Sequence, residues 1–278
     1  MTLNVNTNSA ALAALAALNQ TTDNLATVNA QVSSGLMVAK AKDNPSVYAI
    51  AQSQRTDIQA LSAVSDGLNR AQSISDVAIS AGQTVSDLLN TLKSEALSAT
   101  EASLSTASLS ALNSNFQSTL KQIQQTISAA SFGGANLLDG TSTAGIGFMA
   151  NANATSTITL TGLNLSLGGS TLTVPSTADI STTTHASAVL SLVEGSVANV
   201  NAALASLGAQ SSQLAAHSSF VTTLSDALTV GVGGLVDADT AAESARLTAL
   251  QVQQQLGAQS LSIANQAPSI ILSLFQGH

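Results

Sequence analysis

Most of the chain carries apolar residues at the spacing of an α-helix. Near the N-terminus they form one helical stripe, which Gly35 closes: Leu12, Leu15, Leu18, Leu25, Val28 and Val32. A helix start signal follows at Asn44 and Pro45. Beyond it a seven-residue repeat continues over five heptads: Leu61, Val64, Leu68, Ala71, Ser75, Ala78, Gly82, Val85, Leu89, Leu92 and Ala96. This repeat predicts a coiled-coil-like helix, with small central residues that let a partner helix approach closely.

Further helical runs follow the heptads. The next contains Leu109, Leu112, Phe116, Leu120, Ile123 and Ile127, and we expect it to be antiparallel to the first because the polar break between them is short. Helical spacing returns at Val189, Val193, Val197, Val200, Leu204, Leu207, Leu214, Val221 and Leu228. The glycines at 231, 233 and 234 predict a stop there. The last run contains Val252, Leu256, Ile263, Ile270 and Leu274.

The middle of the chain has a different pattern. From Phe132 to about Thr184 it is rich in Gly, Ser, Thr and Asn, with alternating apolar residues at 157–161, 163–167 and 172–174, which predict short strands and hairpins. The expected fold class is therefore mainly α, a long antiparallel helical bundle with coiled-coil-like termini and a small β-hairpin insertion.

Composition narrows the possible functions. Only 8% of the 278 residues are charged and 2% are aromatic, which leaves few side chains for catalysis. The net charge is −8 and the seven basic residues are scattered, so the sequence argues against a nucleic-acid partner. Cysteine is absent, and the longest apolar run near the N-terminus, Ala10–Leu18, is about half of a membrane span. We expect no enzyme activity, no cofactor and no membrane insertion.

Two weak candidates for metal binding remain open. His185 and His217 lie far apart without metal-ligand spacing, so solvated histidines are favoured over a metal site. Asp237, Asp239 and Glu243 offer oxygen ligands for calcium, although capping of the next helix by Asp239 is the favoured interpretation. A phosphate loop at the glycines after residue 230 is disfavoured because they follow a helix.

Three separated motifs together resemble bacterial flagellins. They lie in order at Val32–Leu36 with Ala39–Ser46, at Phe132–Gly140, and at Asp237–Leu247 with Gln251–Gln255, Ala264–Pro268 and Ile271–Leu274. The resemblance is to a short flagellin of the alphaproteobacterial type. It implies a structural subunit that assembles with its own copies into the extracellular flagellar filament for motility. It further implies secretion, with the flagellar export apparatus, a flagellin chaperone, and filament cap and hook-junction proteins as partners.

The resemblance also implies a division into three parts. Residues 1–40 with 240–278 form the paired terminal helices of the inner tube. Residues 41–132 with 184–239 form a helical bundle, and residues 133–183 form a small exposed β-rich insertion. The alternative function is a cell-surface binding protein or adhesin for a polysaccharide, built on the same scaffold; an enzyme inserted in the centre is disfavoured because the insertion is short.

The two uncharged terminal stripes are the candidate polymerisation residues. Each stripe must bury its apolar side against another helix, either within the chain or in a neighbouring copy. Both outcomes are open at this point. The candidates are Leu15, Leu18, Leu25, Val28, Val32, Val252, Leu256, Ile263, Ile270 and Leu274.

Overall fold

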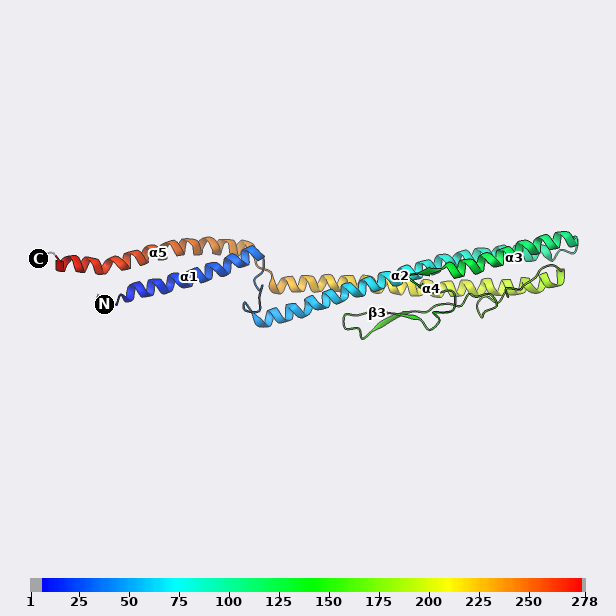
Figure 1. The fold of residues 1–278 in the computed structure, drawn as a ribbon, viewed down its shortest axis with the longest axis horizontal. Coiled ribbons are helices and arrows are strands. Elements are labelled where there is room, and N and C mark those ends of the chain that lie inside the picture. The colour runs from blue at the N-terminus through cyan, green and yellow to red at the C-terminus, as the bar shows by residue number, and fades with distance from the viewer. Residues whose placement is uncertain (1–6, 277–278) are drawn as a thin grey trace. The chain divides into compact units, whose positions relative to one another are not determined.

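The computed structural model describes residues 7–276, and of these the side chains up to residue 266. Within this range lie five α-helices and two pairs of short strands (Figure 1). The chain divides into two compact units, residues 1–56 with 228–278 and residues 57–227. The division into three parts predicted from the sequence stays a prediction.

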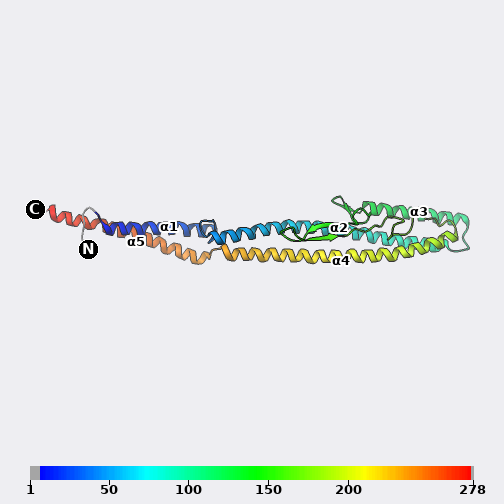
Figure 2. The same cartoon turned by 90° about the horizontal axis from the view of Figure 1, so that it is seen from below.

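The first unit contains two antiparallel terminal helices, α1 (Ser9–Ser34) and α5 (Thr240–Gln276), which lie side by side in both views (Figures 1 and 2). Asn8 caps α1, because its side-chain oxygen accepts from the Ala11 N–H at 3.1 Å. Gly35 ends α1 as predicted, in the left-handed conformation at φ 71°. The chain after Gly35 then runs beside the start of the segment leading to α5, where Leu36 forms an isolated antiparallel bridge with Asp237.

The second unit is built on the parts of α2 (Pro45–Ala99) and α4 (Thr183–Val236) that lie within residues 57–227, and these parts run antiparallel. Gln72 donates to the Ser211 hydroxyl at 2.7 Å, and Lys93 pairs with Glu194 at 3.0 Å. Every position of the predicted heptad run from 61 to 96 is buried, so that prediction is confirmed. At Gly82 an added Cβ would lie 2.5 Å from Leu204 Cδ2, which shows how closely the two helices approach at the small residues.

The third helix of this unit, α3 (Thr106–Ala129), returns along α2 after a short break (Figure 2). Ser105 caps it, and Phe116, Leu120 and Ile123 are buried. After α3 the strands β1 (Ser131–Phe132) and β2 (Ala135–Asn136) form a tight hairpin. Gly133 and Gly134 make its turn with φ of 58° and 83°, a conformation that strongly favours glycine. The predicted end of the helix at Phe132–Gly134 is confirmed to within three residues.

The strand predictions for the middle of the chain are only partly correct. Strands β3 (Ile146–Met149) and β4 (Thr157–Leu160) pair antiparallel, which confirms the strand predicted at 157–161. The prediction at 172–174 is wrong, because the chain there is irregular, whereas the segment 163–167 forms only an isolated antiparallel bridge between Asn164 and Asp139. Leu165, Leu172 and Val174 are nevertheless fully buried. Leu163 and Leu165 donate their backbone N–H groups to the carbonyls of Leu137 and Leu138, whereas the alternation at 172–174 reflects burial along an irregular segment.

The predicted helix stop at the glycines after residue 230 is wrong as well. Helix α4 continues through Gly231, Gly233 and Gly234 to Val236. Each glycine costs about 1 kcal/mol in a helix, but Val232 and Val236 are buried and favour its continuation. The helix ends where the Met37 N–H donates to the Val236 carbonyl at 2.7 Å. Helix α4 is long and apolar enough to cross a membrane. Length and hydropathy are the only criteria met, and core helices of soluble proteins meet them too.

Candidate assembly surface

The seam between α1 and α5 is made of residues three and four positions apart on each helix. The residues withdrawn from solvent on α1 are Ala11, Ala14, Leu18, Thr21, Leu25, Val28 and Val32, and those on α5 are Leu247, Leu250, Gln254, Gly257, Leu261 and Ala264. This spacing is that of a two-helix coiled coil.

Polar groups and one glycine set the register of this seam. Asn8 donates through Nδ2 to the Ala264 carbonyl at 2.7 Å, and Gln254 donates through Nε2 to Thr22 Oγ1 at 3.4 Å. An added Cβ on Gly257 would lie 3.3 Å from Leu18 Cδ1, so the helices approach closely there. A hollow of about 220 Å³ beside this point is lined by Ala14, Ala17 and Leu256 among others. The seam is therefore specific in register.

Three further apolar side chains of α5 are largely left uncovered by α1, although one of them, Leu256, borders the hollow beside Gly257. Val252 is 51% exposed, Leu256 58% and Ile263 63%. At 100° per residue these three lie on the side of α5 opposite Gln254 and Leu261, and we call them the outer face of α5. On α1, Leu12 and Leu15 are also exposed, by 60% and 42%. Both terminal helices thus leave apolar side chains in water, on the outer face of α5 and at Leu12 and Leu15 of α1.

The structure divides the predicted polymerisation residues into two groups. Leu18, Leu25, Val28 and Val32 lie in the intramolecular seam, whereas Leu15, Val252, Leu256 and Ile263 are exposed. Ile270 and Leu274 lie outside the residues whose side chains are described.

The sequence analysis missed the α5 side of the seam. Gln254 and Gly257 interrupt the apolar pattern there and concealed Leu250 and Leu261. A search for heptads that tolerates one polar residue and one glycine would have found these positions.

Comparison with known proteins identifies the family. A model of the bacterial flagellin N-terminal helical region matches residues 5–143, and a model of the C-terminal helical region matches residues 190–275. The chain belongs to the flagellin family. Its similarity extends over full length: it is 45% identical to flagellin FljJ of Caulobacter vibrioides, with 100% of each chain covered. It is 36% identical to a flagellin of Brucella melitensis, with 98% of each covered.

This flagellin is therefore a structural subunit of the bacterial flagellar filament, a protein that assembles with its own copies. The predicted fold class, mainly α with small antiparallel strand pairs, is confirmed. A crystal structure of Bacillus cereus flagellin is also similar, at 19% identity and a TM-score of 0.48, covering 55% of this chain and 86% of that one.

The carboxylates near the start of α5 in this flagellin have a structural role. Asp239 Oδ1 accepts from the N–H groups of Ala241 and Ala242 at 3.0 and 3.1 Å, which confirms the predicted helix cap. Glu243 lies 3.8 Å from Arg246, one turn along α5. These side chains serve the start of the helix, where negative charge is favourable.

Each of the two histidines in the described part of the chain lies within hydrogen-bonding distance of a different partner. His217 Nε2 lies 2.7 Å from the Ala150 carbonyl, and His185 Nδ1 lies 3.2 Å from Asp179 Oδ2. Slight burial raises the pKa of Asp179, but hydrogen bonds from the Ser181 backbone and hydroxyl and from His185 outweigh it and lower the pKa overall. Among the described residues, no three of these side-chain types gather as metal ligands would.

Proposed function

We propose that the outer face of α5, together with Leu12 and Leu15 of α1, forms the contact between copies in the filament. The supporting observation is that Val252, Leu256 and Ile263 stay more than half exposed although α5 is already paired with α1. Burying one such side chain contributes about 1.5–3 kcal/mol. A contact that repeats in every subunit along a polymer adds this amount many times over.

The chemistry of the terminal helices fits burial among like copies. The first ionisable side chain of the sequence is Asp23, and none follows Arg246 until His278. Two such uncharged surfaces can meet without burying an unpaired charge, which would cost several kcal/mol. Because these stretches carry no charged side chains, two copies do not repel each other there.

The route to the filament is part of the same proposal. The polymer lies outside the cell, so each subunit is secreted before it assembles. The family implies passage through the flagellar export apparatus, a chaperone that covers the terminal apolar side chains beforehand, and cap and hook-junction proteins at the ends of the filament. The relatives are flagellins over their full length, and no finding supports the alternative of a polysaccharide-binding adhesin.

Removing about 40 residues from each end tests this proposal. Residues 41–238 retain the whole second unit with its buried heptad run, so we expect cooperative thermal unfolding close to that of the full chain. They lack α1 and α5, so we expect no polymer in sedimentation or electron microscopy. Filaments grown from residues 41–238 under the conditions that polymerise the full chain would refute the role of the terminal helices.

A further inference from the structure

The end of α4 contains three glycines that packing does not explain. Gly231, Gly233 and Gly234 lie within the last two turns of the helix, and none of them has a positive φ. A Cβ added to Gly231 or Gly234 would meet no atom within 4 Å beyond its chain neighbours and the backbone of α4. One added to Gly233 would approach the carboxylate of Asp237 at 2.8 Å. Two of the three positions therefore have room for a larger side chain.

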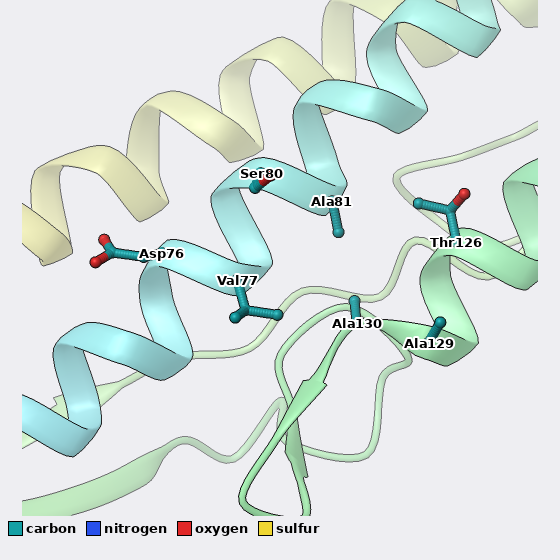
Figure 3. Close-up of a pocket in the computed structure, with 7 residues that line it drawn as sticks. All are labelled: Asp76, Val77, Ser80, Ala81, Thr126, Ala129 and Ala130. Atoms are coloured by element: carbon teal, nitrogen blue, oxygen red, sulfur yellow. The ribbon is translucent and has the colours of Figure 1, made fainter.

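Small residues elsewhere in the chain have a packing role. An added Cβ at Gly82 or Gly257 would lie 2.5 or 3.3 Å from a leucine of the neighbouring helix. Ala81 of α2 and Ala129 at the end of α3 border a shared hollow of about 570 Å³ (Figure 3). These small residues shape the space between two helices, whereas two of the three glycines at the end of α4 are exposed.

The remaining effect of the three glycines is to weaken the helix. Replacing alanine by glycine in a helix interior disfavours the helix about four- to fivefold, and three such residues together disfavour it about a hundredfold. Thr229, Val230 and Val232 of the same stretch are β-branched, which also favours extended backbone. No other stretch of α4 of this length contains more than one glycine. Residues 228–235 are therefore the part of α4 with the lowest helix propensity.

Few side chains hold this stretch in place. Among residues 228–235 only Val232 is buried, whereas Val230 is 76% exposed. Unwinding these residues therefore removes mainly the burial of one valine, rather than that of a whole seam. The backbone groups that it frees can reach water, because most of the stretch is exposed or half-exposed.

The residues that follow this stretch are held by the chain after α1. The Val236 carbonyl accepts from the Met37 N–H at 2.7 Å, and the Ala238 N–H donates to the Gly35 carbonyl at 2.9 Å. These two hydrogen bonds flank the isolated antiparallel bridge described above. They do not involve residues 228–235, so the weak stretch can open without breaking them.

We propose that residues 228–235 form a hinge that unwinds while the rest of α4 stays helical. Eight residues rise about 12 Å as a helix and about 26 Å as an extended chain, so unwinding lengthens the connection between α4 and α5 by up to about 14 Å. The connection between α1 and α2, residues 36–44, contains no helix and needs no unwinding to lengthen. The inference rests on the chain itself and not on the proposed contact between copies.

Amide hydrogen exchange of the unpolymerised, full-length chain tests the hinge. We expect protection factors for residues 228–235 at least about tenfold lower than for residues 203–211 of the same helix, and insensitive to low concentrations of urea, because a local opening exposes little surface. Replacing two glycines together, Gly231→Ala with Gly234→Ala, should raise the protection of the hinge about twentyfold, since each change favours the helix about four- to fivefold.

Gly208→Ala is the matched control. Gly208 also lies in α4, and an added Cβ there likewise meets nothing within 4 Å. We expect it to change the protection of residues 228–235 by less than about twofold, because it lies outside the hinge. Equal protection along α4, or exchange of residues 228–235 only when the whole chain unfolds in urea, would overturn the inference. A rise in the double variant no larger than that in the control would also overturn it. Since the monomer is measured, each of these results would leave the proposed contact in the filament standing.

Discussion

Replacing Ile263 with aspartate is expected to stop filament growth while leaving the flagellin monomer folded. Ile263 is 63% exposed on the outer face of α5, so the substitution removes little contact within the chain. Between copies it removes an apolar side chain worth about 1.5–3 kcal/mol and introduces an unpaired charge. Since about 1.4 kcal/mol is a factor of ten, the critical concentration should rise at least about a hundredfold. Sedimentation of seeded samples measures it.

Ser262→Asp is the matched control for this substitution. It adds the same charge at the adjacent position, which is also exposed but lies about 100° away around α5, off the outer face. We expect its critical concentration to stay within about threefold of that of the unsubstituted chain. Equal behaviour of the two aspartate variants would show that charge near the end of α5, rather than the outer face, controls assembly.

Replacing Leu89 with alanine is expected to produce the largest loss of stability of the second unit. Leu89 is fully buried in the heptad run of α2, and a truncation of this kind costs about 2–5 kcal/mol, part of it from the cavity left behind. The free energy of unfolding from a urea titration measures the change. Leu97→Ala on the same helix is the control: Leu97 is 56% exposed, so its truncation should change stability by less than about 0.5 kcal/mol. Similar losses of stability at both positions would contradict the assignment of the heptad run as the buried side of α2.

The helices of this flagellin could be predicted because their signals are local. Asn44 supplies a cap, its side-chain oxygen lying 3.2 Å from the Val47 nitrogen, and Pro45 begins α2 as expected. The five heptads of α2 place their small and apolar residues on one stripe of the helix, and every residue of this stripe is buried. The continuation of α4 through three glycines could not be predicted locally, because the burial of Val232 and Val236 decides it.

The assembly surface was only partly predictable for a different reason. Spacing shows that an apolar residue lies on a helical face, but it does not show which partner covers that face. On α1 the predicted stripe coincides largely with the seam, as at Leu25 and Val28. On α5 an apolar face with Val252 and Ile263 is exposed, whereas Gln254 faces α1. A face occupied by a polar side chain and a glycine has too weak a hydrophobic pattern to be chosen from sequence.

Thiol labelling of an Ile263→Cys chain tests most directly whether the outer face of α5 is buried between subunits. The chain contains no other thiol, and the substitution keeps an uncharged side chain at this position. We predict rapid reaction with a maleimide in the monomer and at least about tenfold slower reaction in sedimented filaments, with a much smaller change for Ser262→Cys. Equal labelling of Ile263→Cys in monomer and filament would contradict the proposal that this face forms the subunit contact.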